Sequence, residues 1–200
     1  AYQKSDYEKA QILAQTILDS GEESPVLYNI LGAIYSNKGN NLQAKENFQI
    51  SIKKFPDFQA SYFNLGNILH SESDNKNALK NFYKSVEIDK NFGPAYENII
   101  IILANEGNLE EADEYLKKAK KNSAIANIYY FEGFLYQKKD LYQEAEKLFI
   151  KQLKLTPGHF LSSKGLGELM QIKGKTEEAI KFYQNSIEQG NHIDSFLNLS

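Results

Sequence analysis

The sequence predicts an all-α fold made of antiparallel helix pairs, and three observations lead to this prediction. Residues recur every 34 positions, so that Ala44 returns as Ala78 and again as Ala112. Within each period, apolar residues lie three or four positions apart, which places them on one face of a helix. No segment alternates between apolar and polar residues for long enough to indicate a strand.

Each period contains two helices and a turn. In the first period the first helix carries a repeated set of residues, Tyr28, Leu31, Gly32 and Tyr35. A glycine turn follows at residues 37–41. The second helix then presents Ala44, Phe48, Ser51 and Ile52 on one face, and Pro56 stops it. The pattern therefore predicts a helical hairpin as the repeating unit.

The periods divide the chain into five full units. Their expected bounds are 25–58, 59–92, 93–125, 126–159 and 160–193. We expect residues 1–24 to hold the second helix of a preceding unit and residues 194–200 to begin a further one. The chain opens without a methionine, so we expect it to be an excised piece of a longer protein. Together the units predict one solenoid domain over 1–200, in which stacked hairpins bury apolar faces that a single hairpin cannot bury.

Small residues at fixed places explain how the helices of one hairpin meet. Gly32 and Gly66 on first helices, and Ala44 and Ala78 on second helices, have too little side chain to hold two helices apart. We therefore expect a close approach within each hairpin, with large residues filling the gap to the next.

Composition excludes several classes of function. The chain has 200 residues, no cysteine and a formal net charge of -3, and all of its basic residues are lysine. Without cysteine there are no disulfides, thiolate zinc sites or cysteine nucleophiles. Without arginine or an excess of positive charge, nucleic acid and anionic membranes are not expected partners. No apolar run is long enough to span a bilayer, and we expect a cytoplasmic protein.

At this point the sequence resembles the tetratricopeptide repeat (TPR) family. That family's signature is an aromatic residue followed by Leu-Gly, Tyr, Ala, Phe, Ala and Pro at fixed places in 34 residues. The first full unit matches it with Tyr28, Leu31, Gly32, Tyr35, Ala44, Phe48, Ser51 and Pro56. The resemblance implies a right-handed superhelical solenoid that acts as a scaffold for protein binding. It also implies that first helices line a concave surface where ligands bind.

Three departures from the signature mark the middle of the chain. Ile100 replaces the glycine of the third unit, and Glu132 replaces the leucine of the fourth. One residue is also missing near 120–123, because Ala145 follows Ala112 after only 33 positions. We therefore expect the junction between the third and fourth units to be loosened or kinked.

No group of residues indicates catalysis, a cofactor or a metal. The three histidines, at positions 70, 159 and 192, are too scattered to form a ligand set. Gly174-Lys175-Thr176 lacks the preceding glycine and strand that a phosphate-binding loop needs. Acidic pairs at the starts of second helices are explained by the helix dipole.

The candidate binding residues lie on first helices, at positions that the resemblance places on the concave surface. They are Asn29, Phe63, Asn64, Asn67, Asn98, Tyr130 and Phe134. Asparagine carries both a donor and an acceptor, so it can pair with a peptide backbone of any sequence. Aromatic side chains add contact area at low entropy cost. The alternative is that the three aromatics are core residues between units.

Two subfamilies refine the expectation. The first helices lack the basic residues with which TPR clamps hold acidic chaperone tails. By contrast, Tyr62-Phe63-Asn64-Leu65-Gly66-Asn67 and Tyr96-Glu97-Asn98-Ile99 are similar to repeats of O-GlcNAc transferases, whose asparagines hold substrate backbones. Bacterial fusions of TPR repeats to glycosyltransferases or sulfotransferases carry similar repeats.

The leading hypothesis is a non-catalytic module that binds an extended peptide or a partner helix in its concave groove. The alternative is a substrate-recognition arm of a larger enzyme, whose catalytic domain lies outside this chain. We also expect end-to-end self-association, because the chain stops partway through a hairpin and leaves Phe196, Leu197 and Leu199 without part of their cover.

Overall fold

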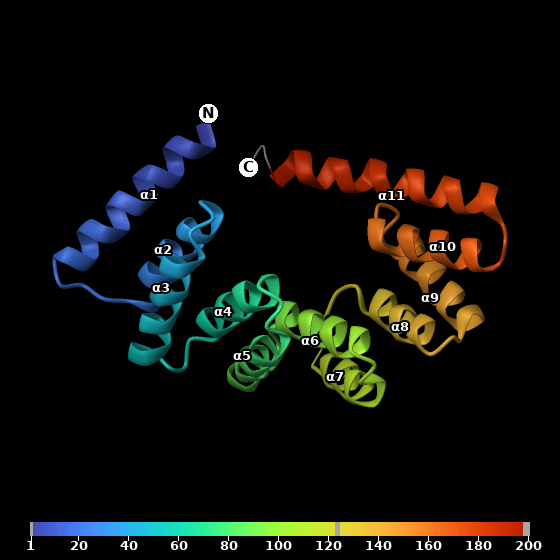
Figure 1. Ribbon diagram of the computed structural model, residues 1–200, viewed down its shortest axis with the longest axis horizontal. Coiled ribbons are helices and arrows are strands. Elements are labelled where there is room, and N and C mark those ends of the chain that lie inside the picture. The colour runs from blue at the N-terminus through green and yellow to red at the C-terminus, as the bar shows by residue number, and fades with distance from the viewer. Residues whose placement is uncertain (1, 123–124, 198–200) are drawn as a thin grey trace. The chain divides into compact units, whose positions relative to one another are not determined.

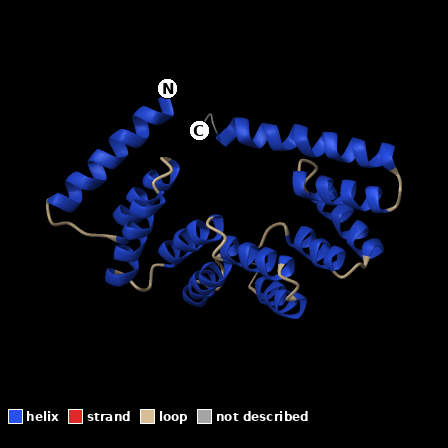
Figure 2. Cartoon of the chain, viewed as in Figure 1, coloured by secondary structure: helices blue, strands red, loops and turns tan. Residues whose placement is uncertain are grey.

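The computed structural model describes residues 2–122 and 125–197, and within these ranges all regular structure is helical (Figure 2). The expected all-α fold is therefore confirmed. The helices are α1 (Tyr2–Asp19), α2 (Pro25–Asn37), α3 (Asn41–Lys54), α4 (Gln59–Ser71), α5 (Asn75–Ile88), α6 (Gly93–Asn105), α7 (Leu109–Lys121), α8 (Ile128–Lys138), α9 (Tyr142–Leu155), α10 (Phe160–Ile172) and α11 (Thr176–Leu197) (Figure 1). They form two compact units, residues 1–102 and 103–200, and the boundary lies inside α6.

Side-chain caps fix where several helices begin. Ser24 accepts a hydrogen bond from the backbone N–H of Leu27, and Pro25 occupies the first turn of α2, where its missing N–H costs nothing. Asn40 and Asp74 cap α3 and α5 in the same way. The polar residues that the sequence places in the turns therefore also start the second helices.

A left-handed residue ends each first helix. Its φ is positive at Gly39, Ser73, Gly107, Asp140 and Gly174, which recur at the repeat spacing. In every case the next residue donates its backbone N–H to a carbonyl five positions earlier, as Asn40 does to Tyr35 at 2.9 Å. This closing bond is that of a Schellman motif, and it reverses the chain tightly toward the second helix.

Glycines on first helices let aromatic rings of second helices sit directly on the backbone. A Cβ added at Gly32 would lie 2.4 Å from the Phe48 ring, and one added at Gly66 would lie 2.7 Å from the Phe82 ring. The Phe149 ring fills the space between α8 and α10, where it meets both Gly133 and Gly165. The close approach expected within the hairpins is therefore present, and in residues 103–200 one ring also joins successive hairpins.

The core of each unit lies between successive hairpins. In residues 1–102, Ala44 and Phe48 of α3 pack with Leu65 and Ile68 of α4. In residues 103–200 the fully buried positions include Leu135, Phe149, Leu166 and Leu169. Buried residues thus come from neighbouring helices in the chain, as nearest-neighbour stacking requires.

The last helix differs from the expectation. α11 runs without a break to Leu197, across position 194, where a further repeat was expected to begin. Pro56 and Pro157 follow the ends of α3 and α9, but Asn191 stands at the corresponding place in α11 and does not stop the helix. The side chains of Phe196 and Leu197, and all of Leu199, lie outside the described residues.

Candidate functional site

Asparagines on neighbouring first helices pair with each other. The Asn64 amide nitrogen on α4 donates to Asn29 Oδ1 on α2 at 2.9 Å. The Asn98 amide nitrogen on α6 donates to Asn67 Oδ1 on α4 at 2.8 Å. Both bonds tie together side chains from successive repeats, so they fix the rotamers of the predicted asparagines and support the stacking of the first helices.

These pairs leave three half-buried polar groups without partners among the described residues. They are Asn64 Oδ1, the Asn67 amide group and Asn98 Oδ1. Two are acceptors and one is a donor. A peptide in an extended conformation offers the complementary groups, because each of its residues carries one N–H and one C=O.

Asn29 differs from the other three asparagines and is a correction to the expectation. Its side chain is only 9% exposed, and its nitrogen lies 2.6 Å from Ser61 Oγ, 3.1 Å from Ser51 Oγ and 2.8 Å from the Pro25 carbonyl. The two serine hydroxyls also bond to each other at 2.7 Å. Asn29 is therefore the centre of a buried polar network joining α2, α3 and α4, and its donors are not available to a ligand.

A groove of about 250 Å³ adjoins the asparagine pairs in residues 1–102. Asn64 and Asn67 line it from α4. The remaining lining residues are Ala33, Ser36, Asn37, Phe48, Ile68 and Ser71. The groove thus has exposed apolar surface at Ala33, a base formed by the nearly buried Phe48 and Ile68, and a margin of amides and hydroxyls. This mixture is common in sites that bind peptides or small ligands.

Phe63 and Tyr130, two of the predicted aromatics, pack against other rings of the same compact unit. The half-buried Phe63 ring meets Phe92 edge-on, with centroids 5.1 Å apart, and Phe82 at 5.8 Å. Tyr130 is 9% exposed and contacts Phe131, Phe149 and His159. The alternative that aromatics are core residues between units therefore describes Phe63 and Tyr130 better than a ligand-contacting role does.

Phe134 has a more open position. It is half-buried, stacks on Tyr130 with centroids 6.2 Å apart, and has the Lys138 ammonium group 5.4 Å from its ring centre. The cation covers one face of the ring and attracts its π electrons. Phe134 lies in residues 103–200, whereas Asn64, Asn67 and Asn98, which we call the asparagine surface, lie in residues 1–102.

Glu97 is a polar residue next to Asn98 that was not among the predicted site residues. It precedes Asn98 on α6 and is half-buried, and burial raises the pKa of its carboxyl group above the ordinary value. Its position in the repeat is that of Asn29 and Phe63, which was the available signal. Burying a carboxyl group costs free energy unless a polar group pairs with it, so a glutamate at this partly buried position indicates a polar role there.

A second missed feature is a polar bridge between a second helix and the end of the next first helix, found at the α1–α2, α3–α4, α7–α8 and α9–α10 junctions. Lys45 pairs with Glu72, Asp113 with Lys139, and Glu146 with Lys173. Gln11 accepts from Lys38 at 2.6 Å at the corresponding place. The partners stand 26 or 27 positions apart and carry complementary groups at these four junctions, whereas Leu79 stands at the corresponding place on α5.

His159 has a structural role. Its ring is largely buried, and Nδ1 accepts a hydrogen bond from the backbone N–H of Ser162 at the start of α10. Burial lowers the pKa of His159 below 6.5, which keeps the imidazole neutral and able to accept. Within the described ranges, no group of three or more His, Asp or Glu residues is placed to hold a metal ion.

None of the helices in the described part of the chain has the length and apolar character needed to cross a membrane.

Comparison with known proteins identifies the repeat. A family model described as "Tetratricopeptide repeat" matches residues 60–92, 95–124 and 126–159. A comparison with curated protein sequences gives no match.

Solved structures share the fold. MamA from Desulfovibrio magneticus RS-1 is 17% identical, with a TM-score of 0.65 and coverage of 86% of this chain and 97% of that one. PilW, described as a widely conserved type IV pilus biogenesis factor, is 18% identical, with a TM-score of 0.72 and coverage of 84% and 79%. Yeast Tom70 is 22% identical, with a TM-score of 0.72, and the match covers 94% of this chain but only 40% of Tom70. At these identities the likeness shows the fold alone.

Helix pairs of this kind form interaction scaffolds that bind protein partners, and their repeats are typically non-catalytic. The recurring Leu-Gly and Ala positions, the glycine–aromatic contacts between paired helices, the family model and the solved structures agree. The chain belongs to the tetratricopeptide repeat family.

Proposed function

We propose that residues 25–102 bind an extended segment of a partner polypeptide through its backbone. The observation that carries the proposal is the set of unpaired groups on Asn64, Asn67 and Asn98, held in place by the asparagine pairs. A peptide strand would donate to the two half-buried, unpaired acceptors and accept from the Asn67 amide. Because the amides are already oriented, binding loses little side-chain entropy.

The groove beside Asn64 and Asn67 suits this ligand. Its apolar surface can take one side chain of the peptide, while the amides contact the backbone. Selectivity among peptide sequences is then set by that one side chain, and the backbone contacts are common to all. A substrate-recognition arm of an enzyme would use the same surface, so the same variants test that alternative.

The test uses peptides selected from a random library with the whole chain as bait. Each is titrated calorimetrically against wild type and against the triple variant Asn64→Ala, Asn67→Ala, Asn98→Ala. Leaving a buried partner unpaired costs about 1–3 kcal/mol, so we expect affinity to fall at least tenfold, since about 1.4 kcal/mol is one decade. The loss should be similar for unrelated peptides, and raising the salt concentration should change affinity little.

A matched control makes the same chemical change elsewhere. Asn77, Asn81 and Asn91 lie on α5 and in the loop after it, outside the asparagine surface. Changing these three to alanine should leave affinity unaltered, and circular dichroism should show that both triple variants are folded. Equal affinities in the two triple variants, or steep salt dependence in the wild type, would exclude the asparagine surface as the binding site.

We also propose that the chain self-associates through its outer apolar residues. On α1, Ile12 is 67% exposed, although the equivalent positions of later repeats carry charges such as Glu46 and Lys80. Ile187 on α11 is similarly exposed. Sedimentation should show association that rises with concentration and weakens in Ile12→Lys. Association of equal strength in wild type and Ile12→Lys would exclude α1 as the contact.

A further inference from the structure

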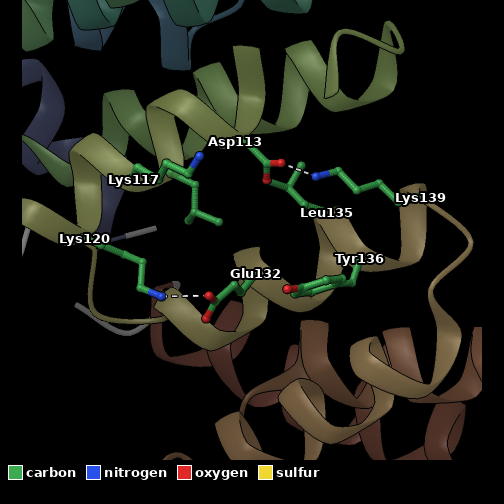
Figure 3. A pocket seen from close by; sticks show the side chains of 8 residues that line it. Asp113, Lys117, Lys120, Glu132, Leu135, Tyr136 and Lys139 are labelled. Carbon is green, nitrogen blue, oxygen red and sulfur yellow. Dashed lines mark hydrogen bonds and ion pairs between the residues drawn. The ribbon is translucent and has the colours of Figure 1, made fainter. Parts of the chain in front are cut away.

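The junction between α7 and α8 contains a pocket of about 270 Å³ (Figure 3). This is the place where one residue is missing from the repeat and where Glu132 replaces the leucine. The lining residues are Asp113, Leu116, Lys117, Lys120, Glu132, Leu135, Tyr136 and Lys139. In other repeats the corresponding leucines, such as Leu31 and Leu166, are buried in the core. At this junction an apolar contact is replaced by a polar, open site.

Two ion pairs occupy opposite sides of the pocket (Figure 3). Lys120 Nζ lies 2.7 Å from Glu132 Oε1, and Lys139 pairs with Asp113. Both carboxylates that line the pocket are therefore already neutralised. Three lysines against two carboxylates leave one positive charge in excess, and within the described residues the ammonium group of Lys117 has no ion-pair partner.

The neighbouring repeats explain why Tyr136 is also unpaired. At the equivalent junction of α1 and α2, Gln11 donates to the Tyr35 hydroxyl at 3.2 Å while accepting from Lys38. In the α7–α8 junction Asp113 stands in the place of Gln11, and a carboxylate has no N–H to donate. That carboxylate pairs with Lys139 instead of accepting from Tyr136. The Tyr136 hydroxyl has no hydrogen-bond partner among the described residues, and Figure 3 shows it pointing toward the Glu132 side of the pocket.

We propose that this pocket binds the carboxylate of an acidic side chain from a partner polypeptide. The Lys117 ammonium group supplies the charge, and the Tyr136 hydroxyl donates a hydrogen bond to the carboxylate. Leu116 and Leu135 cover the methylene stem on which a glutamate carboxylate arrives. A chain-terminal carboxylate is attached directly to the backbone and has no such stem to lie against the two leucines.

This site is distinct from the asparagine surface in residues 25–102, because it binds by charge and the asparagine surface binds by neutral hydrogen bonds. It depends on charge, so raised salt should weaken it. The lysines involved lie on a second helix and at the end of a first helix, and Glu132, where other repeats have leucine, lines the pocket.

The probe is the peptide acetyl-Gly-Glu-Gly-amide. It is titrated into the whole isotope-labelled chain, and binding is measured from the backbone amide chemical shifts of the chain. We expect saturable shifts centred on residues 113–120 and 132–139. The same peptide with glutamine should bind at least about tenfold more weakly, because a charge-assisted contact is lost. Lys117→Gln and Tyr136→Phe should each weaken binding of the glutamate peptide, and Lys121→Gln, an exposed lysine on the same helix that does not line the pocket, should not.

Each outcome of these titrations either overturns or supports the proposal. Equal binding of the glutamate and glutamine peptides, or equal effects of Lys117→Gln and Lys121→Gln, overturns the proposal. Tighter binding of acetyl-Gly-Gly with a free carboxyl end overturns the choice of a side-chain carboxylate. Shifts confined to other residues also overturn it. Loss of binding in Lys117→Gln and Tyr136→Phe, with unchanged circular dichroism, supports it.

Discussion

Replacing Gly66 with alanine tests whether glycine–aromatic contact holds a hairpin together. The added Cβ would lie 2.7 Å from Cε1 of Phe82, and Phe82 is fully buried, so the ring has no free space into which to move. Overpacking costs about 1–3 kcal/mol, and removing a glycine from a helix returns roughly 1 kcal/mol. We therefore expect a net loss near 1 kcal/mol in the free energy of unfolding, measured by urea denaturation followed by circular dichroism.

The third repeat suggests the compensating change. It carries Ile100 where the others have glycine, and Leu116 where others have an aromatic ring. Phe82→Leu should accordingly relieve the clash in Gly66→Ala, so that the double variant is at least about 1 kcal/mol more stable than the sum of the single losses predicts. Gly190→Ala is the control, because its Cβ would meet only Phe160 at 3.9 Å. Strict additivity of the two changes, or equal stability of Gly66→Ala and Gly190→Ala, would refute this account of the packing.

Three further changes test other parts of the structure. Burial lowers the pKa of His159, so the free energy of unfolding should fall as pH drops below the unfolded-state pKa of 6.5. His159→Asn can still cap α10 but carries no titrating group. Urea titrations should therefore show a smaller loss of stability between pH 7 and 5 in this variant. Glu132→Leu should raise the melting temperature by a few degrees, because a partly exposed ion pair contributes little; a lower melting temperature would show that the pair with Lys120 matters. Asn29→Ala should destabilise by about 1–3 kcal/mol and Asn67→Ala by much less, and similar losses would contradict the assignment of Asn29 to the core.

The repeat and its helices could be predicted because each depends on residues close in sequence. A helix turn needs contacts three or four positions apart, and the pairing of Gly32 with Phe48 repeats at the same spacing in Gly66 with Phe82. Thus the hairpin and its tight packing follow from one period of sequence. The end of α11 was missed because no local residue signals it: α5 ends at Ile88 although Lys90 stands at the proline position, whereas α11 continues past Asn191.

The binding surface was harder to predict, because chain position alone does not tell a surface asparagine from a buried one. Asn29 and Asn64 both lie on first helices, one position apart in the repeat. Whether each is exposed depends on Ser51 and Ser61, which lie far along the chain and only meet Asn29 after the hairpins stack. The α7–α8 pocket likewise depends on two distant changes, at Asp113 and Glu132, that act together only in the folded chain.

The left-handed residues at the ends of the first helices include positions where a substitution should increase the stability of the fold. Three of these five positions hold glycine, but Ser73 and Asp140 adopt the same conformation with side chains that disfavour it. The Asp140 carboxylate accepts a bond from the Tyr142 hydroxyl at 2.5 Å, so that residue has a local use for its side chain. Ser73 has no such bond among the described residues, which makes Ser73→Gly the simplest route to a longer-lived variant for crystallography or display. Because Ser73 does not line the groove, the more stable variant should bind the same partners as the wild type.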